Sequence, residues 1–179
     1  MIDNGLENIL GCVAIIPAAG IGKRFGLDKP KQYATLPVKN GKSERCVLEH
    51  TLDLFLNAKV IEKVVLVISD DDNYYSKLDN IHHEKLIIVD GGIERVNSVH
   101  NALKYLFDHS LPDHVTVMVH DAVRPCLKLT DLNQLIEKHH EFRQPCFLSS
   151  SVSDSIKRID DNACVSENVE RDDLVRALT

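Results

Sequence analysis

The stretch "CVAIIPAAGIGKRFGLDKPK" (residues 12–31) passes from an apolar run into a glycine-containing, strongly basic segment. Residues 12–18 are apolar throughout, which is typical of a strand buried on both faces in a parallel sheet. Gly20 and Gly22 allow the backbone to turn tightly and to approach a ligand closely. Four basic side chains follow: Lys23, Arg24, Lys29 and Lys31. Because exposed N–H groups at such a turn attract anions, we interpret the segment as a binding loop for a polyphosphate.

The charge of the chain is distributed unevenly. The net charge of −6 over 179 residues argues against a general nucleic-acid binder. Residues 21–45, however, hold seven Lys or Arg against two Asp or Glu. The loop matches neither G-x-G-x-x-G nor the P-loop pattern, so a bare glycine turn is the simpler alternative. The local basic patch favours a small polyanionic ligand over that alternative.

Outward from this stretch, apolar runs alternate with amphipathic ones. We predict strands at 12–18, 63–69, 85–92, 115–122 and 146–152, and helices at 47–58, 94–109 and 130–142. Strands separated by helices indicate an α/β fold, with a Rossmann-like, mostly parallel sheet and helices on both of its faces. Residues 154–159 and 164–169 predict a β-hairpin, which is marginal in water and needs a partner surface. We expect one domain over residues 1–179, with a protruding arm at about 151–171.

The cysteine content and the hydropathy of the chain indicate its cellular location. The five cysteines are odd in number and form no C-x-x-C pair, which is typical of reduced thiols. No apolar run approaches ~20 residues, so we expect no membrane span. The acidic start of the chain does not match a signal peptide. We therefore expect a cytoplasmic protein without a membrane or nucleic-acid partner.

Parallel sheets bind ligands beyond the carboxyl ends of their strands. The candidate binding residues of this sequence all follow predicted strands, so we expect them at that edge of the sheet. Residues 17–24 follow the first predicted strand; the others that follow a strand are Gly91, Gly92, Arg95, Asp121 and Arg124. Beside a polyphosphate, the carboxylate of Asp121 is a candidate Mg²⁺ ligand. The alternative is an aspartate that only caps a loop.

Four motifs in order carry a resemblance to a known family. They are "IIPAAGIGKRFGLDKPKQY" (15–33), "VDGGIERVNSV" (89–99), "VHDAVRPC" (119–126) and "VERDDLVRALT" (169–179). Together they resemble the 2-C-methyl-D-erythritol 4-phosphate cytidylyltransferases of the non-mevalonate isoprenoid pathway, from about residue 12 to 179. The resemblance implies a fold of the nucleotide-diphospho-sugar transferase type. It also implies a Mg²⁺-dependent reaction of CTP with methylerythritol 4-phosphate that gives the CDP-alcohol and pyrophosphate.

The resemblance also implies roles for individual residues. Arg24 and Lys31 would be catalytic and stabilise the transition state. The nucleotide would be bound by Pro17, Ala18, Ala19, Gly20, Gly22, Lys23, Gly91, Gly92, Arg95, Ser98, Asp121 and Ala122. Gly91, Gly92 and Ser98 would hold the cytosine, and Asp121 would lie near the ribose and the metal. The polyol phosphate would be bound by Arg124, Ser155 and Arg171, with Arg171 on an arm that crosses to the other subunit of a homodimer.

The chain departs from the family pattern at several positions. Ser151 and Ser155 replace a proline and a threonine that are usual on the arm, and Ile93 replaces a common acidic residue. The family's domain continues beyond A-L-T, so we expect this chain to lack that C-terminal portion. Two alternatives follow: a cytidylyltransferase for another polyol phosphate, such as ribitol 5-phosphate, or a CTP-binding module without catalysis.

Overall fold

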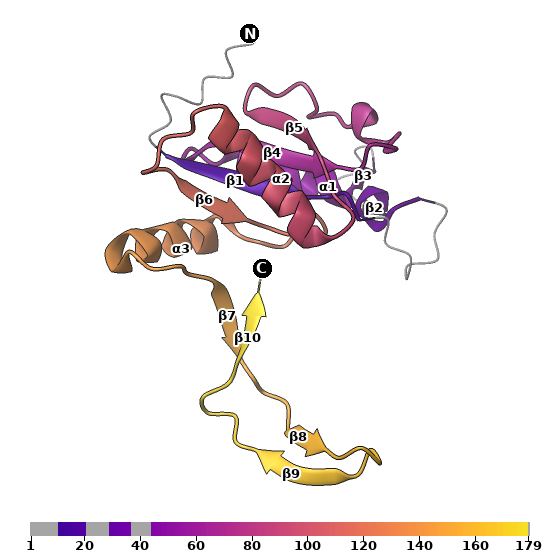
Figure 1. Cartoon of the computed structure of the whole chain (residues 1–179), viewed down its shortest axis with the longest axis vertical. Coiled ribbons are helices and arrows are strands. Elements are labelled where there is room, and N and C mark those ends of the chain that lie inside the picture. Colours follow the sequence, from indigo (N-terminus) through magenta and orange to yellow (C-terminus); the bar gives the residue numbers. More distant parts are fainter. Residues whose placement is uncertain (1–10, 21–28, 37–43, 179) are drawn as a thin grey trace. The chain divides into compact units, whose positions relative to one another are not determined.

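A computed structural model describes residues 11–20, 29–36 and 44–178 of the chain, with the elements labelled in Figure 1. Contacts divide the chain into two compact units, residues 1–129 and 130–179, and each is described by itself. The expectation of a single domain with an arm remains a prediction. No helix among the residues so described is long and apolar enough to cross a membrane.

A parallel sheet forms the centre of the first unit. Its strands are β1 (Cys12–Pro17), β4 (Ile61–Ile68), β5 (Leu86–Asp90) and β6 (Thr116–Val119), in the order β5-β4-β1-β6. All three pairings are parallel. β1 and β4 are buried along most of their length, as the apolar sequence of β1 and the apolar run 64–68 of β4 require. Four of the predicted strands are therefore confirmed, and so is the α/β class.

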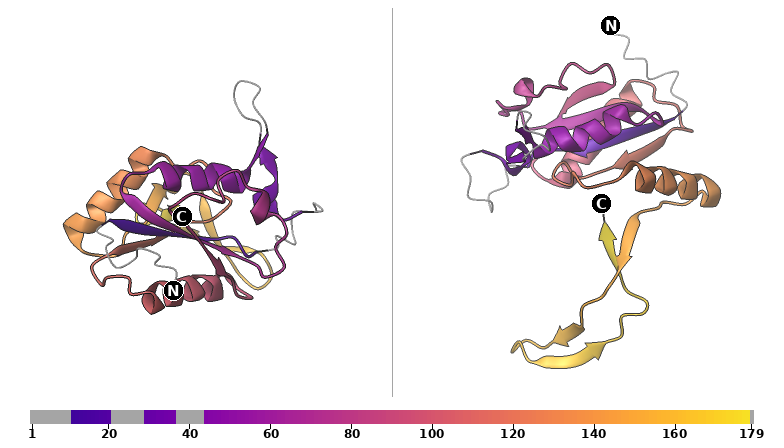
Figure 2. Two further views of the ribbon diagram at one scale, coloured as in Figure 1. Left: turned by 90° about the horizontal axis from the view of Figure 1, so that it is seen from above. Right: turned by 180° about the vertical axis from the view of Figure 1, so that it is seen from behind.

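Two helices cover the opposite faces of this sheet (Figure 2). They are α1 (Val47–Asn57) and α2 (Arg95–Asp108). Alternate side chains of a strand point to opposite faces, so Val13 and Ile15 pack with Ala102 and Leu106 of α2. On α1 the apolar face is buried, and Phe55 is only 1% exposed. Burying such a side chain contributes roughly 1.5–3 kcal/mol to stability.

The strand order creates a crevice at one edge of the sheet. From β1 the chain proceeds to β4 and β5 on one side, and α2 then returns it to β6 on the other side of β1. Connections therefore diverge between β1 and β6, which is where such sheets bind ligands. Small elements lie along the β1–α1 connection: η1 (Lys31–Tyr33), β2 (Thr35–Leu36) and β3 (Arg45–Cys46). Another turn, η2 (Tyr75–Lys77), follows β4.

The second unit contains α3 (Leu129–Phe142) and two antiparallel ribbons. β7 (Leu148–Ser151) pairs with β10 (Val175–Leu178) in an antiparallel ribbon. The prediction that residues 146–152 add a fifth strand to the parallel sheet is wrong. The Leu-Ser-Ser-Ser sequence of β7 alternates half-buried and exposed positions, as in a ribbon with one face in water. The continuous apolar pattern of β1 and β4 is absent from it.

The predicted hairpin is confirmed as β8 (Ile156–Ile159) and β9 (Val165–Val169). Its turn is closed by Asp160, whose carboxylate accepts the backbone N–H groups of Asn162 and Cys164 at 2.9 Å each. The cross-strand pair of Ile159 and Val165 leaves 60% and 64% of these residues exposed. The ribbon thus carries apolar side chains that no described residue of the second unit covers.

Candidate functional site

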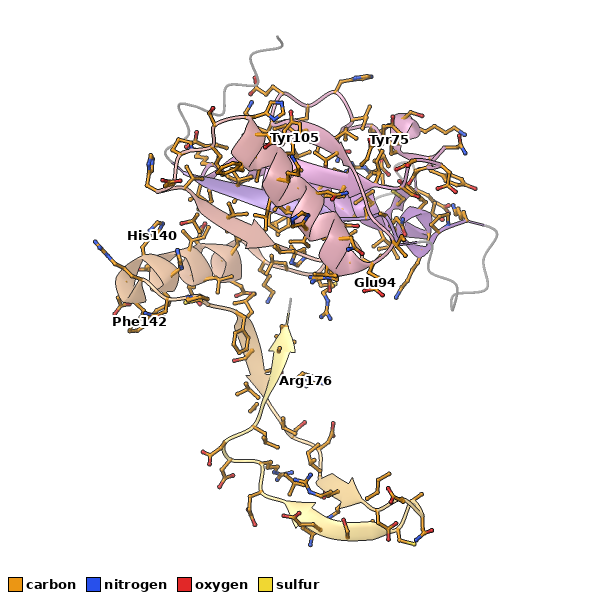
Figure 3. The ribbon with its side chains drawn as sticks, viewed as in Figure 1. Tyr75, Glu94, Tyr105, His140, Phe142 and Arg176 are labelled. Atoms are coloured by element: carbon orange, nitrogen blue, oxygen red, sulfur yellow. The ribbon has the colours of Figure 1, made fainter. Side chains whose placement is uncertain are left out.

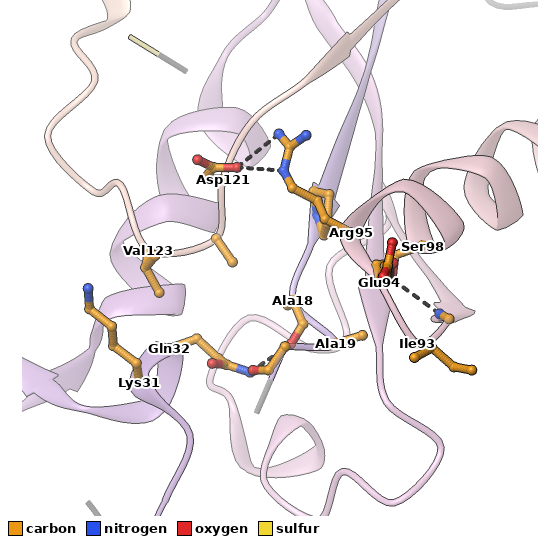
Figure 4. A pocket seen from close by; sticks show the side chains of 14 residues that line it. Ala18, Ala19, Lys31, Gln32, Ile93, Glu94, Arg95, Ser98, Asp121 and Val123 are labelled. Carbon is orange, nitrogen blue, oxygen red and sulfur yellow. Dashed lines mark hydrogen bonds and ion pairs between the residues drawn. The ribbon is translucent and has the colours of Figure 1, made fainter. Parts of the chain in front are cut away.

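A pocket of about 260 Å³ opens beyond the carboxyl ends of β1, β5 and β6 (Figure 4). Ten residues predicted for the nucleotide or for catalysis line it: Pro17, Ala18, Ala19, Gly20, Lys31, Gly92, Arg95, Ser98, Asp121 and Ala122. Residues that are far apart in the sequence thus share one pocket at the carboxyl edge of the parallel sheet, as the sequence predicts. Sequence reasoning had not assigned roles to Gln32, Ile93, Glu94 and Val123, which also line the pocket.

The loop after β5 approaches the loop after β1 closely. The N–H of Gly91 donates to the carbonyl of Ile68 at 2.6 Å, which continues the parallel pairing of the strands. A Cβ at position 91 would collide with the side chain of Ala19 and would lie 2.9 Å from that carbonyl. Position 91 therefore requires glycine because of space, and the two loops form one wall of the site.

Ser98 fixes the turn that leads into α2. Its side chain is buried, and its Oγ accepts the N–H of Gly92 at 3.1 Å and donates to the carbonyl of Glu94 at 3.3 Å. Glu94 caps the N-terminal end of α2, where Figure 3 labels it. The hydroxyl of Ser98 is thus part of the loop's own hydrogen bonding, while the predicted contact with cytosine remains a prediction.

Asp121 is the charged centre of the pocket. The guanidinium of Arg95 donates from Nε to its Oδ1 at 3.0 Å, and a second nitrogen lies 2.9 Å from the same oxygen. On the other carboxylate oxygen, the Nε of Arg124 donates at 3.0 Å. Bonds between ionised partners are the stronger kind of hydrogen bond, although all three side chains are partly exposed here and water screens them.

The loop that carries Asp121 is held from beneath. His120 is buried, and its backbone N–H donates to the carbonyl of Ile15 at 3.0 Å. Its Nε2 lies 3.0 Å from the carbonyl of Arg124, so that nitrogen carries the proton and donates. Burial lowers the pKa of His120 below its ordinary value, which keeps the ring neutral. The hydroxyl of Thr51 also donates to the carbonyl of Ala122 at 2.9 Å.

Lys31 reaches the pocket from η1. Lys31 is exposed, whereas the two residues that follow it in the turn, Gln32 and Tyr33, are buried. The Tyr33 hydroxyl donates to Asp72 Oδ2 at 2.6 Å, and its ring stacks on Tyr74 with centroids 5.1 Å apart. Burial and the neighbouring Asp72 raise the pKa of Tyr33, so it stays protonated. The turn is therefore anchored while its cation faces the site.

Several predicted residues do not appear in this pocket. Gly22, Lys23 and Arg24 lie outside the described residues. Ser155 and Arg171 belong to the second unit, where both are exposed and the Arg171 guanidinium donates to the carbonyl of Ser153 at 2.6 Å. Their predicted roles toward the polyol phosphate remain predictions.

Among the described residues, the side chains that could bind the predicted Mg²⁺ are few. In the described part of the chain, no three His, Cys, Asp or Glu side chains gather as a preformed cation site. Mg²⁺ in proteins is commonly held by one or two carboxylates together with substrate phosphates and water. Two carboxylates line the pocket, Asp121 and Glu94, and that of Glu94 is engaged as the cap of α2. Asp121 therefore fits an ion of that kind, held largely by the nucleotide.

Comparison with known proteins supplies a family. The sequence profile of 2-C-methyl-D-erythritol 4-phosphate cytidylyltransferase matches residues 12–179. Curated proteins of that name from Shewanella halifaxensis and Vibrio cholerae are 42% and 43% identical to this chain. Each of these alignments covers 93% of this chain and 68% of the relative.

Solved structures agree with the sequence comparison. A 4-diphosphocytidyl-2C-methyl-D-erythritol synthase superposes with a TM-score of 0.76 at 28% identity, over 94% of this chain and 72% of that protein. The Francisella tularensis 2-C-methyl-D-erythritol 4-phosphate cytidylyltransferase gives a TM-score of 0.63 at 30% identity, over 94% of this chain and 70% of that one.

Proposed function

The chain belongs to the 2-C-methyl-D-erythritol 4-phosphate cytidylyltransferase family, and from that premise we propose that it transfers CMP from CTP to 2-C-methyl-D-erythritol 4-phosphate. The products are 4-diphosphocytidyl-2-C-methyl-D-erythritol and pyrophosphate, in isoprenoid precursor biosynthesis. The observation that carries the proposal is the pocket, which gathers Lys31, Arg95 and Asp121 at the switch point of the sheet. These charges suit a triphosphate and its counter-ion.

The reaction needs positioning and charge stabilisation more than covalent help. A phosphate oxygen of the polyol phosphate attacks the α-phosphorus of CTP, and the bond to the bridging oxygen of pyrophosphate breaks. Negative charge gathers on the oxygens around the transferring phosphorus and on the leaving group. Lys31 supplies positive charge at that point, and Arg24 is proposed to do the same. The small residues at 17–20, together with Gly92, leave room for the nucleotide against the backbone.

We assign the divalent-ion position to Asp121. An Mg²⁺ ion bound there with the triphosphate would neutralise phosphate charge and polarise the leaving group. The two arginines hold the direction of the carboxylate, and each of its oxygens can accept a further partner from the pocket side, such as an ion that arrives with the nucleotide. A cytoplasmic location is consistent with the reduced cysteines, none of which is paired in a disulfide.

The decisive experiment measures pyrophosphate release from CTP in the presence of different polyol phosphates. Release with methylerythritol 4-phosphate, and much less with ribitol 5-phosphate, is the expected result. Preference for ribitol 5-phosphate would favour the alternative substrate. Binding of CTP without release under any acceptor would favour a non-catalytic CTP-binding module.

We further propose that the hairpin of β8 and β9 docks on a second copy of the chain. Two-stranded ribbons are marginal by themselves, and this one exposes Ile159 and Val165. A symmetric pair would bury the same ribbon twice. In such a dimer Arg171, at the base of the ribbon, would contribute to the site of the other subunit.

A further inference from the structure

Gln32 is a buried amide in the middle of η1, and only 4% of the residue is exposed. Its Nε2 donates to the carbonyl of Ala18 at 2.6 Å and to the carbonyl of Gly20 at 3.2 Å. Figure 4 shows the side chain pointing toward Ala18, with the bond between them dashed. Because both neighbours are carbonyl oxygens, only the NH₂ end of the amide can face them, and its two hydrogens match two acceptors.

These two bonds orient the loop that borders the nucleotide pocket. The N–H of Ala18 is held separately, by the carbonyl of Val67 at 2.7 Å. A trans peptide is planar, so the carbonyl of Ala18 and the N–H of Ala19 point in opposite directions. Once Gln32 draws that carbonyl toward itself, the direction of the Ala19 N–H is set as well. Loops otherwise lack a ladder of hydrogen bonds to do this.

The same amide also connects the loop to Lys31. Lys31 and Gln32 are adjacent, with the lysine exposed at the pocket and the glutamine buried under it. On the next residue, Tyr33 ties the turn to Asp72 through its hydroxyl. The position of the catalytic cation and the shape of the loop are therefore determined by one three-residue turn.

We propose that Gln32 is a positioning residue of the site, which holds the loop of residues 18–20 and Lys31 in a fixed relation to each other. The inference rests on the proposed function, since it is the cytidylyl transfer that needs this relation. Gln32 contacts no reacting atom in the proposal and acts through the backbone of Ala18 and Gly20. Misplacing reacting groups by about 1 Å can cost ~10²-fold in rate.

The chemistry of the two bonds gives a sharp substitution. Gln32→Glu keeps the shape but sets a carboxylate oxygen against two carbonyl oxygens, none of which can donate. Burial and the carbonyl dipoles raise the pKa of such a glutamic acid above its ordinary value of about 4.3. The protonated acid regains one O–H donor and can bond one of the carbonyls. Gln32→Met has a similar length and no donor at any pH.

The experiment compares the wild-type chain, Gln32→Glu, Gln32→Met and the control Gln134→Glu, which adds the same charge at an exposed position of α3. Pyrophosphate release gives kcat and KM for CTP between pH 5.5 and 8.5, and thermal melting gives the folded fraction. At pH 8 we expect kcat/KM per folded protein to fall about 10- to 100-fold in both Gln32 variants. As pH decreases, Gln32→Glu should recover toward wild type, whereas Gln32→Met should not. The control should follow wild type throughout.

Two results would overturn the inference: kcat/KM values of both variants within twofold of wild type, or a loss in Gln32→Glu that does not change with pH relative to wild type. If Gln32→Met fails to fold, the pH comparison within Gln32→Glu still decides. Absence of CTP binding and of pyrophosphate release in the wild-type chain would instead refute the proposed function, so the two failures are distinguishable.

Discussion

The guanidinium of Arg95, at the start of α2, holds Oδ1 of Asp121, two residues beyond the end of β6, through two nitrogens at 2.9 and 3.0 Å. This pair links the strand ends on two sides of β1 across the pocket. Arg124 binds the other carboxylate oxygen from within the same loop. The pocket therefore presents a carboxylate that is already oriented, with positive charge on both of its sides.

The metal requirement can be tested on this carboxylate. We expect CTP turnover to vanish in EDTA and to return with added Mg²⁺, because the triphosphate needs its charge neutralised. Asp121→Asn should raise the Mg²⁺ concentration that gives half-maximal turnover. Undiminished turnover in EDTA would remove the ion from the mechanism and leave Asp121 as a structural partner of the two arginines.

Lys31 gives the most direct test of transition-state stabilisation. Lys31→Ala should lower kcat by ~10²–10³ and change CTP affinity far less, since the charge it meets develops during the transfer. Lys104→Ala, which removes a lysine from the exposed side of α2, serves as the control. Turnover close to wild type in a folded Lys31→Ala protein would reject the role. The same prediction holds for Arg24→Ala.

His120 predicts a loss of stability in acid. Its folded-state pKa lies below the ordinary value of 6.5, because burial disfavours the charged ring. Below about pH 6.5 the ring is protonated in the unfolded chain and still neutral in the folded chain. The free energy of unfolding therefore decreases as pH falls below that value. Gln at this position can still donate to the carbonyl of Arg124 but does not titrate. Urea unfolding at pH 7.5 and 5.5 should show a smaller decrease for His120→Gln; equal decreases would contradict the assignment.

Cys46 predicts the opposite dependence in alkali. Burial raises the pKa of its thiol from 9.0 to about 11, and the side chain caps the N-terminus of α1. Between pH 9 and 11 the unfolded thiol ionises while the folded one does not, so stability declines by up to about 3 kcal/mol. Cys46→Ser keeps a capping oxygen without that titration. Its unfolding free energy should therefore decrease less between pH 8.5 and 10.5 than that of wild type, as measured in urea.

Assembly can be tested on the ribbon. Light scattering should give about twice the chain mass of 20.1 kDa at micromolar concentration. Replacing Ile159 and Val165 by lysine should shift the mass toward the monomer, because it charges the apolar pair that the second copy would cover.

Mixing Arg171→Ala with Lys31→Ala chains should restore some activity if the site is shared. A wild-type monomer would contradict the dimer, and mixed dimers without rescue would place Arg171 outside the partner's site.

The main sheet and its binding edge could be predicted from the sequence, whereas the second ribbon and the support of the site could not. Apolar runs predict β1 and β4, and the rule that ligands bind at the carboxyl edge of a parallel sheet predicts that Gly92, Arg95 and Asp121 lie together, as they do in the pocket. The pairing of β7 with β10 depends on residues that come much later in the chain. No local pattern along β7 specifies such a partner.

The proposed role of Gln32 could not be predicted from the sequence for a different reason. A glutamine is usually exposed, and neither periodicity nor charge distinguishes a buried one. Its function depends on two carbonyls, at Ala18 and Gly20, whose positions are known only from the fold. The signal that could have found it is its position beside Lys31 in the motif K-P-K-Q.

The contact between Ala19 and Gly91 sets a limit on how this site could be re-engineered. Two loops from different strands meet there with no space for a Cβ at position 91, because the side chain of Ala19 and the carbonyl of Ile68 already occupy it. A mutant library intended to broaden nucleotide choice should therefore leave position 91 as glycine. Ile93, which is fully exposed at the rim of the same pocket, offers freedom at little structural cost. Variation in base preference among evolved variants should therefore collect at the rim and leave this crossing unchanged.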